Sequence, residues 1–152
     1  MKNKNYLNSK ICKECGGACC KFMPGECFPE DFGKPLLENL MESFKSDNWA
    51  IDWWEGDPRY DEGKLEKAYF IRPKIKGVNK LFDPSRGGEC IFLKEKGCAL
   101  SPEKRPISCR LLEPKPKGKG CISHNGTGKR GAALAWLPFT NIILEASRRI
   151  KI

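Results

Sequence analysis

Nine cysteines dominate the chemistry that this 152-residue sequence offers. Four of them lie between Cys12 and Cys20 in the pattern C-x2-C-x3-C-C, and Cys27 follows after six residues. Two cysteines separated by two residues can turn both sulfur atoms toward one ion, and Gly16 and Gly17 permit the tight backbone that such a loop needs. This spacing predicts that the N-terminal loop binds a metal through thiolates.

The adjacent pair Cys19 and Cys20 needs a separate explanation. Neighbouring side chains of an extended backbone point to opposite sides, so these two thiols are not expected to bind the same small ion. Either they serve two neighbouring metal centres, or one is a ligand and the other packs in the core as a small apolar residue. A disulfide between them is a third alternative, which ring strain and a reducing compartment disfavour.

A second group of cysteines, with seven, ten and eleven intervening residues, consists of Cys90, Cys98, Cys109 and Cys121. These residues form no local binding loop, but folding can bring them to the N-terminal loop and so complete its coordination. Eight thiolates suit two tetrahedral zinc sites, or one iron-sulfur cluster with thiols to spare. A cluster offers several metal corners to ligands that converge from different directions, which favours the iron-sulfur alternative.

The composition is that of an ordinary globular protein, with 39% hydrophobic and 31% charged residues. A chain of this length buries a core without crosslinks. The N-terminal stretch MKNKNYLNSK is polar and basic with no apolar run behind it, so no signal peptide or membrane span is expected there. We therefore predict a cytoplasmic protein whose cysteines stay reduced and bind metal rather than form disulfides.

Hydrophobic spacing predicts the elements between the two cysteine groups. An amphipathic helix is expected over residues 35–45, with Pro35 in its first turn. Trp49, Ile51 and Trp53 alternate as in a half-buried strand. A further strand over residues 68–71 is expected to pair with residues 90–93.

The second cysteine group is expected to start with a hairpin that returns over residues 98–100. Ser101 then caps a short helical segment that carries Cys109 and Arg110. The tail over residues 131–150 is apolar at helical spacing, and Pro138 should kink or divide it. Its expected core residues are Leu134, Leu137, Ile142, Ile143 and Ala146.

No internal repeat and no clean domain boundary are evident. We therefore predict one small α+β domain over residues 1–152, in which a short sheet with helices holds the cysteine-rich loop and the second cysteine block around a metal centre.

The segments CKECGGACC and GGECIFLKEKGCALSPEKRPISCRLLEP together resemble the YkgJ-type cysteine-cluster family, which is described as zinc- or iron-chelating domains. The resemblance covers residues 12–32 and 87–113. It implies that the metal set leaves Cys27 out and consists of Cys12, Cys15, Cys19, Cys20, Cys90, Cys98, Cys109 and Cys121. The cysteine motif is also similar to that of flagellin lysine N-methylases, where it accompanies an iron-sulfur cluster and methyl transfer from S-adenosylmethionine. The likeness to these enzymes extends only to the cysteines, and the chain has no Gly-rich strand-to-helix turn for that cofactor.

Three other side chains are candidates for the site. Arg105 and Arg110 flank Cys109, where their guanidinium groups are predicted to donate hydrogen bonds to thiolates or to cluster sulfur atoms. The resemblance supports this role because its second segment contains an RPxxCR pattern. His124 follows Cys121 at C-x2-H spacing, and it is either a nitrogen ligand or a solvated loop residue.

Two functions are favoured by the sequence, and an enzyme of the methyltransferase type is a third that only the likeness to the N-methylases implies. The first is an iron-sulfur protein, with a 4Fe-4S cluster, that has a redox role or an accessory role in modification chemistry beside an unidentified protein partner. The second is a zinc-stabilised module that contacts nucleic acid or an acidic protein through its basic half. That half is residues 64–152, which contain twenty basic and seven acidic residues.

Overall fold

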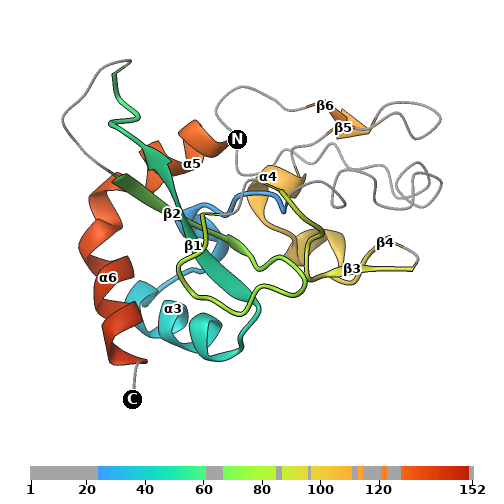
Figure 1. The fold of residues 1–152 in the computed structure, drawn as a ribbon, viewed down its shortest axis with the longest axis horizontal. Coiled ribbons are helices and arrows are strands. Elements are labelled where there is room, and N and C mark those ends of the chain that lie inside the picture. The colour runs from blue at the N-terminus through green and yellow to red at the C-terminus, as the bar shows by residue number, and fades with distance from the viewer. Residues whose placement is uncertain are drawn as a thin grey trace.

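The computed structural model describes residues 24–60, 67–84, 87–95, 97–110, 113–114, 121–122 and 128–150. At its centre, strand β1 (Trp49–Glu55) pairs antiparallel with strand β2 (Lys67–Pro73), and Ile51 lies opposite Ile71. Both strands are rich in the branched and aromatic residues that suit a pleated, half-buried surface. Helices flank this pair, so the described part of the chain is the small α+β fold that the sequence predicts (Figure 1).

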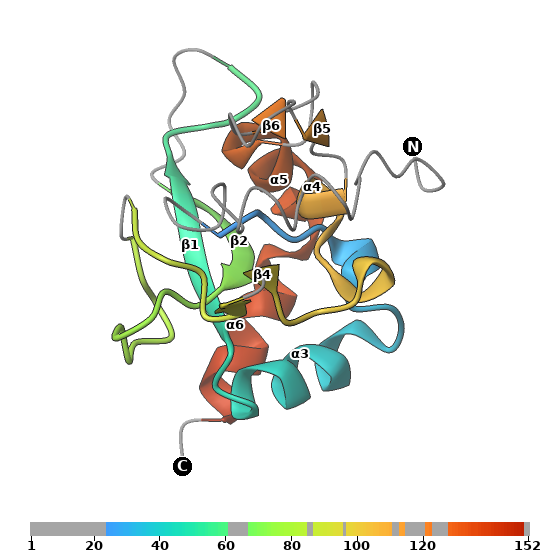
Figure 2. The same cartoon turned by 90° about the vertical axis from the view of Figure 1, so that its right-hand side faces the viewer.

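The helices follow the predicted positions closely. Helix α3 (Leu36–Lys45) begins directly after Pro35, which is its N-cap rather than part of its first turn. The tail is divided at Pro138 as predicted: α5 (Lys129–Trp136) and α6 (Thr140–Arg149) are joined by the 3-10 turn η4 (Leu137–Phe139). Helix α6 packs on α3, and α5 packs on both strands (Figure 2).

The core lies where the helices meet the strands. Trp136 is fully buried, and its indole ring lies against the rings of Phe32 and Phe139. Ile143 and Ala146 are buried as predicted, whereas Leu134 is 40% exposed. The prediction for Leu134 is wrong because α5 turns a different face, Ala132, Ala133 and Trp136, toward the core.

Single extended segments border the strand pair on both sides. The N–H of Cys27 donates to the carbonyl of Ile71 on β2 at 2.8 Å. On the other side, Ile51 of β1 donates to Leu81 at 2.6 Å and accepts from Asp83 at 2.8 Å. These segments use backbone groups at strand edges that would otherwise need water or another chain.

The predicted pairing of residues 68–71 with residues 90–93 is wrong. All seven residues of β2 pair with β1, which is equally long and close in sequence. Cys90 instead forms an isolated bridge with Ile75, just beyond the end of β2. Leu93 then turns back and donates to the carbonyl of Cys90 at 3.0 Å, which ends the extended segment.

The second cysteine block consists of short elements. The predicted hairpin is present, with β3 (Leu93–Lys94) paired to β4 (Gly97–Cys98). The 3-10 turn η2 (Pro102–Lys104) and helix α4 (Ile107–Arg110) follow, on either side of Pro106. Strands β5 (Glu113–Pro114) and β6 (Cys121–Ile122) form a second short pair. Among the described residues, none of the helices has both the length and the apolar character needed to cross a bilayer.

Candidate metal centre

The predicted metal ligands divide into two groups by what the structure describes. Cys12, Cys15, Cys19, Cys20 and also His124 lie outside the described residues, and of Cys121 only the backbone is described. The cysteines with described side chains are Cys27, Cys90, Cys98 and Cys109, and all four are thiols rather than disulfides.

Cys27 is fixed more firmly than any sequence pattern indicates. Its N–H is bonded to Ile71 of β2, and its carbonyl accepts a hydrogen bond of 2.9 Å from the indole Nε1 of Trp136 on α5. None of its surface is exposed. The sheet and the C-terminal helix pair therefore hold the position of this cysteine from two sides.

Asp31 connects the segment of Cys27 to the helix of Cys109. Asp31 ends the 3-10 turn η1 (Pro29–Asp31), and its Oδ2 accepts the N–H of Phe28 at 2.8 Å. Both carboxylate oxygens also accept the N–H of Ile107, the first residue of α4, at 3.1 and 3.0 Å. One ionised side chain therefore holds two segments 76 positions apart in sequence, and the segment from residue 24 runs between β2 and α4 (Figures 1 and 2).

Gly25 lies directly against the thiol of Cys109. A Cβ atom at residue 25 would be 2.4 Å from Cys109 Sγ and 3.5 Å from the Cys109 amide nitrogen. Carbon and sulfur atoms cannot approach so closely without a shift of one of them. Only glycine fits at this position, and the backbone that leads to Cys27 therefore passes alongside the Cys109 side chain.

Cys90 is placed by the extension of β2. Ile91 donates to the carbonyl of Lys74 and Lys76 donates to the carbonyl of Glu89, both at 2.9 Å. Cys90 lies between these two bonds and is 5% exposed. Gly88 has a φ of 148°, and a Cβ there would be 2.4 Å from Ile75 Cγ2, so this approach also requires glycine.

The surroundings of Cys27 disfavour its charged form. Burial raises the pKa of its thiol well above the ordinary value, and Asp31, Cys109, Glu26 and Cys90 raise it further. Cys27 is therefore within electrostatic range of Cys109 and of Cys90, although the three residues come from separate segments.

The described cysteines do not by themselves form a complete set of metal ligands. In the described part of the chain, no three cysteine, histidine or acidic side chains are grouped closely enough to hold a metal ion. Electrostatic effects extend several ångströms, whereas a Zn–S bond is only about 2.3 Å long. The described residues therefore supply neighbouring thiols, and any complete site also needs ligands from outside them.

Glu26, half-buried beside Cys27, has a pKa raised to about 7. Burial is the main cause, and Asp52 also raises the pKa. A bond from its own backbone, together with Lys129 and Arg72, lowers the pKa and only partly offsets the burial. Glu26 therefore changes charge near neutral pH.

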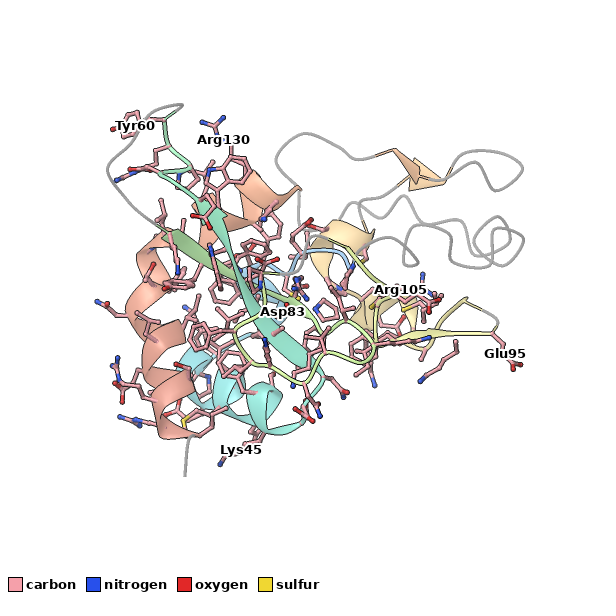
Figure 3. The ribbon with its side chains drawn as sticks, in the orientation of Figure 1. Lys45, Tyr60, Asp83, Glu95, Arg105 and Arg130 are labelled. Carbon is pink, nitrogen blue, oxygen red and sulfur yellow. The ribbon has the colours of Figure 1, made fainter. Side chains whose placement is uncertain are left out.

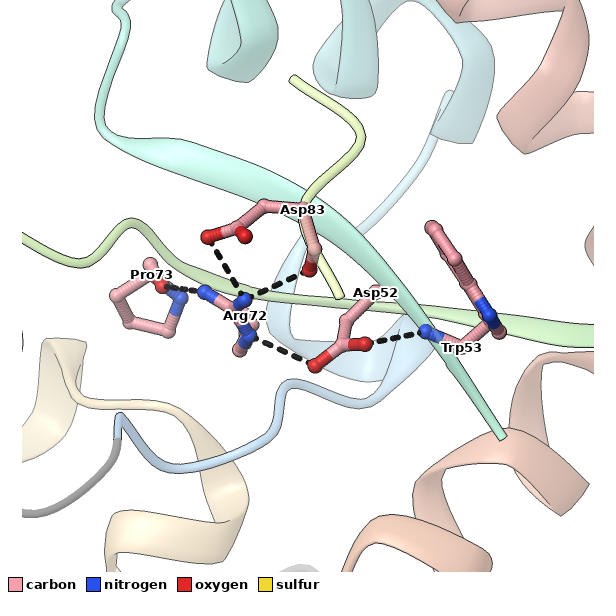
Figure 4. A network of polar contacts seen from close by, with 5 residues as sticks. All are labelled: Asp52, Trp53, Arg72, Pro73 and Asp83. Atoms are coloured by element: carbon pink, nitrogen blue, oxygen red, sulfur yellow. Dashed lines mark hydrogen bonds and ion pairs between the residues drawn. The ribbon is translucent and has the colours of Figure 1, made fainter. Parts of the chain in front are cut away.

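A buried ionic network stabilises the sheet behind this segment (Figure 4). Arg72 is fully buried, and its Nε donates to Asp52 Oδ2 at 2.9 Å. Its other two nitrogens donate to the carbonyl of Pro73 at 3.0 Å and to the carbonyl and carboxylate of Asp83 at 2.8 and 3.0 Å. Asp52 Oδ1 accepts the N–H of Trp53 at 2.7 Å, so every charge has hydrogen-bonded partners.

The two predicted arginines contribute less to the described site. Arg105, which lies in the second cysteine block (Figure 3), donates through Nε to the carbonyl of Leu100 at 3.0 Å. The side chain of Arg110 lies outside the described residues. Hydrogen bonding of these guanidinium groups to sulfur therefore stays a prediction. Cys98 lies half-buried in β4, opposite Leu93.

A groove of about 400 Å³ lies beside Cys27. Phe32 and Trp49, whose rings are 5.6 Å apart, form part of its wall. Asp31 and Lys104 also line it. The groove gives the region around Cys27 an opening to solvent although the residue itself is buried.

A short repeat in the sequence could have indicated that Cys27 has a setting like that of Cys90. The tripeptide Gly-Glu-Cys occurs at residues 25–27 and again at residues 88–90, each time followed by a large apolar residue. In both copies the glycine makes a close approach that leaves no room for a Cβ, and the cysteine is buried. The expectation that the chain has no internal repeat missed this short one.

Comparison of the chain with protein-family models, with curated proteins and with solved structures finds no match.

Proposed function

We propose that this chain is a metal-binding protein whose cysteine thiolates hold an iron-sulfur cluster. The observation that carries the proposal is the docking of the segment after the N-terminal cysteine loop onto the second cysteine block. Gly25 lies against Cys109, and Cys27 is within electrostatic range of Cys109 and Cys90. The contact between Gly25 and Cys109 joins two segments that are far apart in sequence.

Chain length limits where the N-terminal thiols can be. Cys20 precedes Gly25 by five residues. A chain of five residues spans at most about 18 Å, so Cys20 can reach the contact between Gly25 and Cys109. Cys12 is thirteen residues away from Gly25 and is less restricted. Covalent connection is therefore compatible with a site that both cysteine groups share.

The donor chemistry fits an iron-sulfur cluster or zinc better than a hard cation. Every ligand in the predicted set is a thiol, and thiolates bind zinc and iron-sulfur clusters, whereas magnesium and calcium prefer oxygen. When bound, a cluster would supply one-electron redox chemistry. The protein would supply a partly apolar setting, since Cys27 and Cys90 are buried and Phe28 is 6% exposed.

The test is purification without oxygen, followed by measurement of iron, sulfide and zinc per chain and by the visible absorption spectrum. The proposal expects iron and sulfide in similar amounts and a brown protein that bleaches on reduction. Cys109→Ser should lower the metal content, whereas Ser147→Ala, a change at a buried serine on α6, should not. A colourless protein with two zinc ions would support the zinc-stabilised binding module instead, and a chain free of metal would reject both.

A further inference from the structure

Cys27 is the one cysteine that the family resemblance leaves out of the metal set, yet the structure gives it the same setting as Cys90. Both residues follow a Gly-Glu pair and precede a large apolar residue. Both are buried, at 0% and 5% exposure. Cys27 and Cys90 are therefore alike both in their local sequence and in the burial of the thiol.

Both Gly-Glu-Cys segments also dock on the same stretch of chain. Cys27 is bonded through its N–H to Ile71 in β2, and Cys90 is bridged to Ile75, four residues further along. Backbone hydrogen bonds contribute in each case, from Cys27 itself and from Glu89 and Ile91 on either side of Cys90. The stretch 71–75 therefore holds two cysteines that lie 63 residues apart in sequence.

The segment that contains Cys27 lies against the thiol of Cys109. The backbone at Gly25 contacts Cys109 Sγ, and Asp31 ties the residue after Cys27 to the first residue of α4. Cys109 is the third residue of that four-residue helix. The segment of Cys27 and the helix of Cys109 are therefore held next to each other.

The alternative is that Cys27 only fills space in the core, as a buried cysteine often does. Cys27 does belong to the hydrophobic core, together with Phe28, Ile71 and Trp136. Core packing by itself, however, does not account for the repeat of the Gly-Glu-Cys segment or for the contact of Gly25 with the thiol of Cys109. The carboxylate groups of Asp31 and Glu26 and the thiols of Cys109 and Cys90 also act electrostatically on Cys27, and sulfur and oxygen donors near a buried thiol suit a bound cation.

We propose that Cys27 is itself a ligand of the cysteine metal site, as the counterpart of Cys90 in the repeated Gly-Glu-Cys segment. This inference rests on the proposed function, and it changes the ligand set from eight cysteines to one that includes the ninth. On binding, the Cys27 sulfur loses its proton to solvent and forms a bond to the metal. The ligand set then draws on the segment that β2 and Trp136 hold in place.

The experiment compares the full-length wild-type chain with Cys27→Ala and with Ile143→Val. Ile143 is fully buried on α6, so Ile143→Val weakens the core without removing a thiol. Metal content and absorption spectrum are measured after anaerobic purification. Each protein is then freed of metal, reduced and titrated with Co²⁺, because the intensity of the sulfur-to-cobalt charge-transfer band rises with the number of thiolates bound.

The expected result is a changed spectrum and at least a two-fold loss of metal in Cys27→Ala, with a weaker charge-transfer band per cobalt. Ile143→Val should match the wild type in all three measurements. Equal metal content and identical spectra in Cys27→Ala and the wild type would overturn the inference while the proposed function stands. Equal losses in both variants would also overturn it, because the loss would then follow from core destabilisation. A wild-type chain that takes up neither native metal nor cobalt would reject the proposed function itself.

Discussion

Replacement of Arg72 by methionine tests whether the buried ionic network stabilises the sheet that carries the cysteine segments. Methionine keeps most of the length and volume of the arginine stem but removes every donor. The change leaves the carboxylates of Asp52 and Asp83 buried without their cation, together with the carbonyl of Pro73. We expect the folded state to lose stability through these stranded groups rather than through a cavity.

The magnitude follows from the burial of the partners. Side-chain exposures are 0% for Arg72, 0% for Asp52 and 3% for Asp83, so solvent screens the pairs little. Removal of one partner of a buried ion pair costs about 3–5 kcal/mol, because the remaining charge keeps its desolvation penalty. A domain of this size has an unfolding free energy of about 5–15 kcal/mol, so the expected loss is a large fraction of the whole.

The assay is equilibrium unfolding in urea, with the free energy of unfolding and its denaturant slope compared between proteins. Arg148→Met is the matched control, since Arg148 on α6 pairs with Glu145 at 2.6 Å but is 65% exposed. An exposed pair contributes only about 0–1 kcal/mol. The same substitution should therefore have a several-fold smaller effect at the surface.

Equal destabilisation by the two substitutions would refute the reasoning, because burial of the partners would then not determine the cost. Asp83→Asn gives a second check. The backbone carbonyl of Asp83 still accepts from Arg72 at 2.8 Å after that change, so its cost should be smaller than that of Arg72→Met. A larger cost for Asp83→Asn would show that the carboxylates, rather than the guanidinium, organise the network.

Two further predictions concern the segment before Cys27. Gly25→Ala should lower the free energy of unfolding by about 1–3 kcal/mol in the same urea assay, because the added Cβ would overlap Cys109 Sγ. Gly128→Ala is the control, because nothing lies within 4 Å of the added Cβ, and it should cost less than about 1 kcal/mol. Equal costs of the two substitutions would contradict the contact between Gly25 and Cys109. The pKa of Glu26 is raised from 4.5 to about 7 in the folded state. Between pH 4.5 and pH 7 the folded state therefore binds more protons than the unfolded state, and the free energy of unfolding should fall as the pH rises through this range. Glu26→Gln in the metal-free, reduced protein should remove this fall, which amounts to at most about 3 kcal/mol, and parallel pH profiles of the two proteins would contradict the prediction.

The sequence determined the local elements of this protein. Apolar spacing predicted α3, turn chemistry predicted the β3–β4 hairpin, and Pro138 predicted the break between α5 and α6. These features depend on residues within one or two turns of each other, so their physical causes are visible in a short window. The close spacing of the N-terminal cysteines, which predicts a thiolate site, is likewise visible in a short stretch of sequence.

Tertiary structure decided the strand pairing and the setting of Cys27. The sequence predicts that residues 68–71 pair with residues 90–93, but β2 pairs instead with β1, in a seven-residue register between segments separated by a loop. The burial of Arg72 was unexpected because arginine is seldom buried unless paired, and its partner Asp83 lies eleven residues away. Asp31 and Ile107, whose hydrogen bonds join the segment of Cys27 to the helix of Cys109, lie 76 residues apart. Such contacts form only when the whole core assembles, so no local pattern contains them.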